Sequence, residues 1–85
     1  MFHVYAVYSM RSDKIYIGFS SDVERRLESH NDVRNKGWTA KFKPWILIYV
    51  EKCDSKTEAL RREKQLKTSK GRRFIRELID SSIAF

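Results

Sequence analysis

The sequence predicts a small α+β domain, with a three-stranded antiparallel sheet flanked by helices in the order β-β-α-β-α-α. Two short segments rich in β-branched and aromatic residues come first, joined by a polar loop, which is typical of a hairpin. One helical pattern, a third apolar run and two further helical patterns follow. A length of 85 residues supports a single domain at residues 1–85, because two cores would each be too thin.

Composition excludes several classes of protein. No apolar run approaches the roughly 20 residues needed to cross a bilayer, and the N-terminus lacks the basic stretch and apolar core of a signal peptide. Cys53 is the single cysteine, so an intramolecular disulfide and a multi-cysteine zinc site are both excluded. We therefore expect a soluble cytoplasmic protein with no membrane association.

The net charge of +7 is concentrated in one stretch. Nine basic and two acidic residues lie between Lys56 and Arg76, which accounts for the whole excess. Such a field attracts polyanions, nucleic acid before acidic membrane, although a solvated helical face has the same composition. A weaker basic cluster surrounds Trp38 and Phe42, a mixture that suits backbone contact and base stacking. The candidate nucleic-acid-binding residues are Lys41, Lys43, Lys67, Lys70, Arg72 and Arg73.

The expected hairpin joins strands at residues 2–8 and 14–19. A four-residue loop with Tyr8 opposite Asp13 would pair residues whose numbers add up to 21. A one-residue bulge would break that relation. Phe2, Val4 and Ala6 then share an apolar face with Ile15, Ile17 and Phe19. Tyr5 and Tyr16 become direct cross-strand neighbours on the more polar face.

The remaining elements follow from apolar spacing and capping residues. A helix is expected over 21–33, capped by Ser20 or Ser21, with Val23 and Leu27 in its apolar stripe. Arg26 and His30 flank that stripe and point inward. A basic loop at 32–44 leads to residues 45–50, a nearly continuous apolar run expected to be the central or best-buried strand.

A capping box at Ser55 and Glu58 predicts a helix over 56–68 with Ala59, Leu60 and Leu66 in its apolar stripe. Glu63 falls inside that stripe, where a carboxylate must be desolvated, paired or bound to a cation. A last helix over 70–80 is expected to bury Phe74, Ile75, Leu78 and Ile79, with Gly71 marking a bend before it.

Five inward polar residues are thus candidates for a site: Tyr5, Tyr16, Arg26, His30 and Glu63. Cleavage of a phosphodiester needs a base, a fixed cation, a metal ligand and a donor near the leaving oxygen. Each residue also has a structural explanation, such as a half-buried strand tyrosine, a core histidine, or a salt bridge between Arg26 and Glu63. The pattern alone indicates a basic nucleic-acid-binding domain.

The segment Tyr16-Ile17-Gly18, followed by residues 19–31 with Arg26, His30 and Asn31, resembles the signature of the GIY-YIG nuclease family. Residues 57–67 are similar to a later helix of the small stand-alone members, in which a glutamate binds the metal. The sequence departs from the family pattern where His3-Val4-Tyr5 replaces Gly-Ile-Tyr. An asparagine that some members carry near the C-terminus has no clear counterpart.

This resemblance implies hydrolysis of duplex or branched DNA in one step with a single Mg²⁺ or Mn²⁺ ion. Tyr5 would be the general base and Tyr16 a hydrogen-bonding partner of water or phosphate, with His30 orienting or deprotonating a tyrosine. Arg26 would stabilise the phosphate and Glu63 would bind the metal. Similarity to the N-terminal domain of excision-repair nucleases adds an expected role in DNA repair.

Two other classes of function stay open. The fold can serve as a non-catalytic nucleic-acid-binding module, or as an adaptor whose basic helices bind an acidic protein. Since 85 residues leave no room for a recognition module, we expect specificity to be low, or to come from DNA structure or a protein partner.

Overall fold

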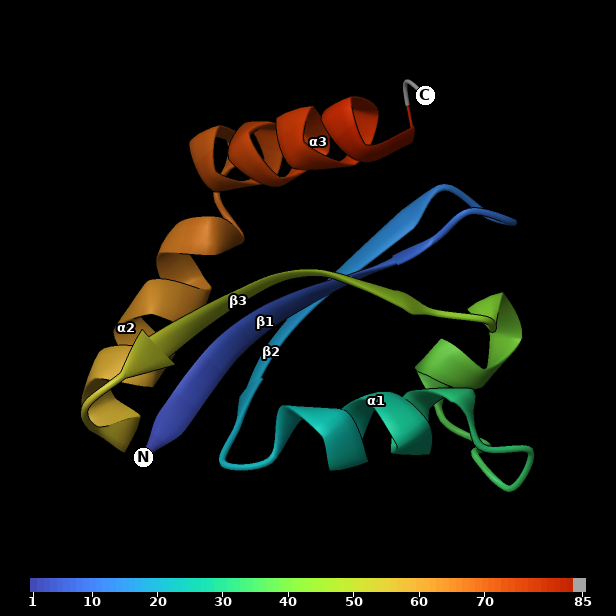
Figure 1. Ribbon diagram of the computed structural model, residues 1–85, viewed down its shortest axis with the longest axis horizontal. Helices are drawn as coiled ribbons and strands as arrows, with labels where there is room; N and C mark the ends of the chain where they lie inside the picture. The colour runs from blue at the N-terminus through green and yellow to red at the C-terminus, as the bar shows by residue number, and fades with distance from the viewer. Residues whose placement is uncertain (84–85) are drawn as a thin grey trace.

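A computed structural model describes residues 1–83, with side chains to Ser82. The predicted fold class and element order are confirmed, and the predicted loop before the third strand contains a short 3-10 helix, η1 (Figure 1). Among the described residues, no helix has both the length and the apolarity needed to cross a bilayer. The elements are β1 (Phe2–Ser9), β2 (Lys14–Ser20), α1 (Val23–Asn31), η1 (Trp38–Phe42), β3 (Ile46–Cys53), α2 (Lys56–Leu66) and α3 (Ser69–Ile83).

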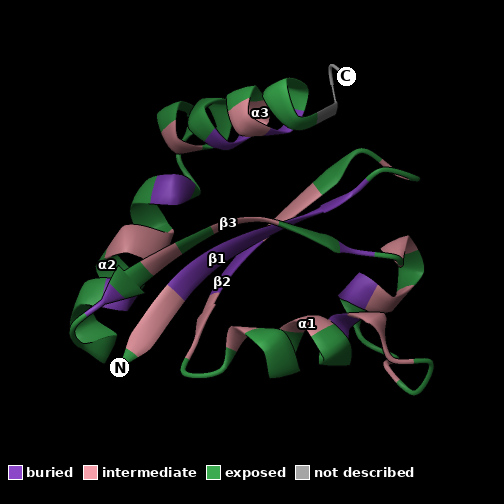
Figure 2. Ribbon diagram, viewed as in Figure 1, coloured by how far each residue is buried: buried purple, intermediate pink, exposed green. Residues whose placement is uncertain are grey.

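The sheet has the order β2-β1-β3 with antiparallel pairing, so β1 is its central strand. The expectation that the third apolar run is the central or best-buried strand was wrong. β1 is buried from Val4 to Ser9 (Figure 2), whereas Ile46, Leu47 and Val50 of β3 are 39–42% exposed. The reason is topological: the hairpin partner occupies one edge of β1, and the chain returns to the other edge.

Helices cover both faces of the sheet. In Figure 1, α1 lies on one side, and α2 and α3 lie on the other. Val4, Ala6 and Ile17 face α2 and α3, so the predicted apolar side of the hairpin is confirmed. Tyr5 and Val7 face the opposite side. There they pack with Trp45, which is 2% exposed, and with Tyr16, Val23, Leu27 and Phe42.

The register of the hairpin differs from the predicted one by two residues. Tyr5 lies opposite Gly18 and Val7 lies opposite Tyr16, so the expected direct Tyr5–Tyr16 pair was wrong. The loop has four residues but begins one residue later, since Ser9 still pairs with Lys14. Asp13 closes the loop at φ 52°, and its Oδ1 accepts from the Tyr8 hydroxyl at 2.8 Å. A two-residue shift preserves the faces, so the tyrosines remain diagonal neighbours.

The helix caps explain where α1 and α2 begin. The cap of α1 is Asp22 rather than Ser20 or Ser21, because Asp22 Oδ1 accepts from the Arg25 amide at 3.1 Å. Ser55 caps α2 as predicted, accepting from the Glu58 amide at 3.2 Å. The carboxylate of Glu58 instead accepts from the Asp54 amide. Leu60 and Phe74, expected to be buried, are 41% and 38% exposed because both helices lie at the surface.

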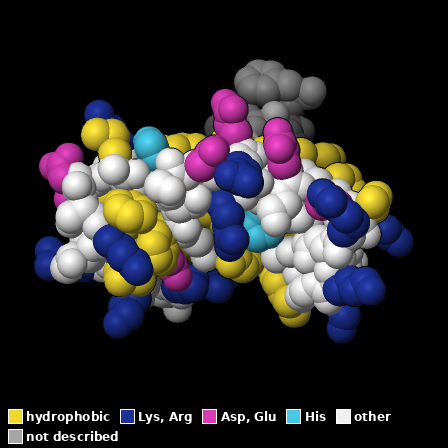
Figure 3. Space-filling view, turned by 90° about the horizontal axis from the view of Figure 1, so that it is seen from below, with side chains coloured by type: hydrophobic (Ala, Val, Ile, Leu, Met, Phe, Trp, Pro, Cys, Tyr) yellow, Lys and Arg dark blue, Asp and Glu magenta, His cyan; other side chains and the backbone are white. Residues whose placement is uncertain are grey.

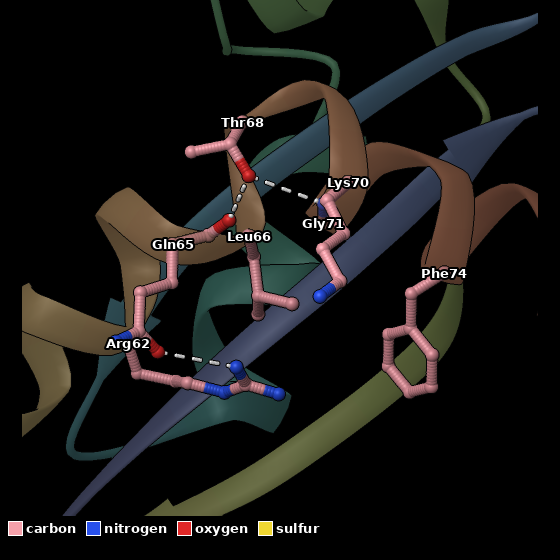
Figure 4. A pocket seen from close by; sticks show the side chains of 7 residues that line it. All are labelled: Arg62, Gln65, Leu66, Thr68, Lys70, Gly71 and Phe74. Carbon is pink, nitrogen blue, oxygen red and sulfur yellow. Dashed lines mark hydrogen bonds between the residues drawn. The ribbon is translucent and has the colours of Figure 1, made fainter.

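The predicted bend between the last two helices is present, but it lies at residues 67–68 and not at Gly71, which belongs to the first turn of α3 (Figure 4). A Cβ on Gly71 would lie 2.4 Å from the Gln65 carbonyl oxygen and 2.5 Å from Leu66 Cα. The Thr68 hydroxyl donates to that same carbonyl at 2.6 Å and accepts from the Gly71 amide. Glycine is therefore required by close approach of α3 to the end of α2.

Candidate active site

The hairpin brings Tyr5 and Tyr16 together over Gly18. The two phenol ring centroids are 6.3 Å apart. A Cβ on Gly18 would lie 2.9 Å from Tyr5 Oη and 3.1 Å from Tyr16 Cε1. The backbone of Gly18 has no positive φ, so the site requires glycine for space and not for conformation.

Replacing Gly18 with alanine is expected to lower the free energy of unfolding by about 1–3 kcal/mol, because the added methyl overpacks a buried site. The Tyr5 ring cannot move away easily, since Tyr5 is 1% exposed and its hydroxyl is hydrogen-bonded. Urea unfolding measures the effect. Gly37→Ala is the control, because a Cβ there meets only Asn35 Oδ1, at 3.3 Å. Equal stability of the two variants would contradict the packing argument.

His30 links α1 to the Tyr5 hydroxyl. It is 6% exposed, and its Nε2 lies 2.9 Å from Tyr5 Oη. Its Nδ1 lies 3.2 Å from Thr39 Oγ1, which also accepts from Asn35 Nδ2 at 2.8 Å. Two tautomers satisfy this chain, and the one with the proton on Nδ1 leaves Nε2 free to accept from Tyr5.

Burial shifts the pKa values of both groups toward their neutral forms. The pKa of His30 is lowered by burial and by the charge of Arg26. The pKa of Tyr5 is raised by burial, an effect that the neighbouring Arg26 guanidinium opposes. At neutral pH the pair is therefore a neutral imidazole against a neutral phenol.

This environment predicts a loss of stability in mild acid. The pKa of folded His30 is below its ordinary value of 6.5, so the unfolded chain binds the proton more readily. The contribution of neutral His30 to the free energy of unfolding is fully present above pH 6.5 and is lost as the pH falls through the lowered pKa. Urea midpoints measured across this range should depend less on pH in His30→Gln than in the wild type. His3→Gln is the control, and an unchanged pH dependence in His30→Gln would contradict the prediction.

Arg26 lies one turn before His30 and is exposed, so the expectation that it points inward was wrong. Its pKa is raised by the hydroxyl of Tyr5 and, to a smaller extent, by Tyr16. Arg26 and Tyr16 both line a hollow of about 480 Å³, which opens at the edge of β2. A guanidinium at an open hollow is suited to bind an anionic group.

Glu63 reaches the same hollow from α2, across the edge of β2. Its side chain is 17% exposed, and Oε1 accepts from Lys67 Nζ at 2.6 Å. The expected alternative, a salt bridge between Glu63 and Arg26, is not formed. The structure thus brings all five predicted residues to one place, with Tyr16, Arg26 and Glu63 lining the hollow and the Tyr5–His30 pair behind Gly18.

The donor set of the hollow fits a weakly held hard cation. Among the described residues, no group of three or more His, Cys, Asp or Glu side chains is placed to bind a metal. Mg²⁺ is often bound by one or two carboxylates, with waters and substrate phosphates completing its shell. Glu63 can serve as such a single ligand through the carboxylate oxygen that Lys67 does not engage.

The predicted nucleic-acid-binding residues do not form one patch. Figure 3, seen from the α1 side, shows Lys and Arg side chains scattered over the surface. Lys43 donates to the Asp32 carbonyl, and Lys67 pairs with Glu63. Lys70 lines a separate hollow of about 490 Å³ between α2 and α3 (Figure 4), which contains none of the five polar residues. Lys41, Arg72 and Arg73 are exposed.

Sequence reasoning missed the residues that hold the site in place. Asn31 accepts from the Trp45 amide at 2.6 Å and donates to its carbonyl at 3.0 Å, which joins α1 to the start of β3. Trp45 Nε1 donates to the Thr39 carbonyl, and Thr39 in turn contacts His30. Thr39 and Asn35 lie in a loop with no periodic signal. Asn31 belonged to the recognised motif, but its partner is 14 residues away.

The replacement of glycine by His3 in the first motif is accommodated without strain. His3 lies in the regular part of β1, paired with Ser20 and Lys52. Asp13 is the one non-glycine residue with positive φ among those described. Tyr5 therefore occupies its position without a glycine two residues earlier.

The fold and site define a class of small domain in which a tyrosine, an arginine and a glutamate line one open hollow, with a hydrogen-bonded tyrosine and histidine next to it. The family model described as "GIY-YIG catalytic domain" matches residues 1–76. UPF0213 proteins of Staphylococcus haemolyticus, Staphylococcus saprophyticus and Staphylococcus aureus are 33% identical over 66 residues, covering 78% of this chain and 80% of each relative. No solved structure matches significantly. The chain belongs to the GIY-YIG family, which implies nuclease-type activity.

Proposed function

We propose that this protein is a divalent-metal-dependent endonuclease that hydrolyses DNA in one step. The observation that carries the proposal is the 2.9 Å contact between Tyr5 Oη and His30 Nε2, next to a hollow lined by Arg26 and Glu63. A phenol joined to a neutral imidazole beside a cation and a carboxylate has the parts needed for hydrolysis of a phosphodiester.

The proton path begins at the Tyr5–His30 pair. A phenol with a raised pKa is a poor base at neutral pH, so it must first lose its proton. In the tautomer with the Nδ1 proton directed at Thr39, His30 Nε2 accepts the Tyr5 proton. The resulting phenolate takes a proton from water as the water oxygen bonds to phosphorus and the bond to the leaving oxygen breaks. The leaving oxygen then takes a proton from solvent, and His30 returns its proton to solvent.

The remaining residues stabilise the negative charge that forms on the phosphate and the leaving oxygen. The Arg26 guanidinium stabilises the negative charge that accumulates on the phosphate oxygens, and Tyr16 donates a hydrogen bond to water or phosphate. Glu63 would hold one Mg²⁺ or Mn²⁺ ion, which when bound supplies Lewis-acid stabilisation of the phosphate and the leaving oxygen. Lys67 engages Glu63 Oε1, which leaves the second carboxylate oxygen for the cation.

Plasmid or branched DNA incubated with Mg²⁺ or Mn²⁺ tests the proposal. Wild-type protein is expected to cleave only when the cation is present. Glu63→Gln should cleave roughly 10- to 100-fold more slowly at limiting cation, because an amide oxygen is a weaker ligand than a carboxylate. Glu58→Gln is the control, since Glu58 accepts from the Asp54 amide in the first turn of α2 and does not line the hollow. Equal cleavage by all three proteins would indicate a contaminating nuclease and reject the assignment.

The second candidate function is a non-catalytic nucleic-acid-binding module. The ion pair between Glu63 and Lys67 favours it, because an ammonium group already neutralises the carboxylate. This candidate predicts binding that weakens with salt, without cleavage at any cation concentration. The same assay therefore separates the two functions.

A further inference from the structure

A second hollow lies along the edge of β2 and has no part in the proposed mechanism. Its volume is about 310 Å³. Its walls come from three distant parts of the chain: the hairpin, η1 and α3. The lining residues are Asp13, Lys14, Ile15, Trp38, Arg72 and Arg76.

This hollow is connected to the candidate active site through shared walls. Trp38 also lines a hollow of about 260 Å³ together with Tyr16 and Arg26. Tyr16 and Arg26 in turn line the hollow that contains Glu63. The Trp38 and Tyr16 ring centroids are 6.3 Å apart, so the two side chains are neighbours. Because Arg26 and Trp38 line the same hollow, a strand with a phosphate at Arg26 would pass close to Trp38.

The Trp38 ring is held firmly but is not covered. It packs against Phe42 at 4.8 Å and against Trp45 at 6.1 Å between ring centroids. The residue nevertheless remains 51% exposed, while Trp45 is 2% exposed. A rigid aromatic surface with one open side is the arrangement on which proteins stack the bases of single-stranded nucleic acid.

The charges around Trp38 are complementary to a phosphate backbone. Lys14, Arg72 and Arg76 face one carboxylate, Asp13, which pairs with Arg76. Arg72 uses its Nε for the Lys67 carbonyl at 3.3 Å, which orients the guanidinium. Among the described residues, Lys14 and Arg72 are thus the cations of this hollow that form no ion pair with a carboxylate.

We propose that this hollow, the Trp38 subsite, binds an unpaired nucleotide of the DNA substrate. The base stacks on Trp38, and Lys14 and Arg72 bind an adjacent phosphate. A paired base inside a duplex has both faces stacked on its neighbours, so the subsite selects DNA with a single-stranded segment beside the cleaved bond. The assignment of this nucleotide to a cleaved strand rests on the proposed function.

Binding measured without a divalent cation tests the subsite separately from cleavage. Fluorescence anisotropy compares a labelled single strand of about 12 nucleotides with a blunt duplex of the same sequence. Trp38→Ala should weaken single-strand binding by about fivefold or more and change duplex binding little. Trp38→Phe should retain most of the affinity. Indole emission should fall when the strand binds to wild type, and this quenching should be absent in Trp38→Phe.

Val33→Ala is the matched control, because Val33 is a 90% exposed apolar residue of the same loop region. An abasic nucleotide at one position should weaken binding to wild type but not to Trp38→Ala. Equal effects of Trp38→Ala on single strand and duplex, or no effect on either, would overturn the subsite. Selective binding without cleavage in Mg²⁺ or Mn²⁺ would leave the subsite standing and reject the nuclease.

Discussion

Replacing Tyr5 with phenylalanine is expected to lower the cleavage rate by about 10²- to 10⁴-fold, the range for loss of a general base. The change removes only the hydroxyl that lies 2.9 Å from His30 Nε2 and leaves the buried ring in place. The buried His30 Nε2 loses its partner, which should cost about 1–3 kcal/mol of stability, so the variant should stay folded. Single-turnover cleavage with saturating cation measures the chemical step.

Tyr8→Phe is the matched control for this prediction. Tyr8 is also a buried tyrosine of β1 with one hydrogen bond, to Asp13, but it faces the opposite side of the sheet. Its rate should stay close to that of the wild type. A Tyr5→Phe rate near the wild-type rate would remove Tyr5 from the reaction and favour a base supplied by water alone.

Replacing Arg26 with alanine is expected to reduce the cleavage rate by about 10²- to 10³-fold, the usual cost of losing one preorganised group that stabilises transition-state charge. Arg26→Lys should recover only part of the rate, because an ammonium cannot hold two phosphate oxygens in a planar fork. Arg26 is exposed, so little stability should be lost. The pKa of Tyr5 should rise further in Arg26→Ala, because the guanidinium lowers it.

Arg25→Ala provides the control for Arg26, since the two arginines are adjacent on α1 and both exposed, yet Arg25 lines none of the three connected hollows. Comparing Arg25→Ala with Arg26→Ala separates a specific effect of Arg26 on cleavage from a general loss of positive charge. Similar losses in Arg25→Ala and Arg26→Ala would show that the arginines attract DNA without acting at the phosphate.

Local signals predicted the elements well and their arrangement less well. Ser55 and Glu58 placed the start of α2, and apolar alternation placed the correct faces of β1 and β2. The position of residues 45–50 was predicted wrongly. An apolar run indicates that a segment is partly buried, but not whether its strand has one neighbouring strand or two. In β3 much of that apolar surface stays exposed at the sheet edge.

The candidate site was predictable because its members lie in recognisable motifs. Helical spacing placed Arg26 and His30 on one side, and the apolar stripe around Glu63 marked an unusual carboxylate. The two-residue error in the hairpin register did not matter for the site, since the side-chain period of a strand is two. No local sequence pattern indicated the residues that hold His30 in place, Asn35 and Thr39. The exposed ring of Trp38 was not indicated either.

The amino-acid order alone determined the family, the sequence of elements and the polar side chains that make up the candidate site, because caps, periodicity and motif spacing are local properties. Only the tertiary structure decided that β1 is the central strand and that Glu63 and Arg26 line the same hollow at the edge of β2. It also placed Trp38 between that hollow and the basic residues of α3. These relations depend on strand order and on packing between segments far apart in the chain, which no local pattern encodes.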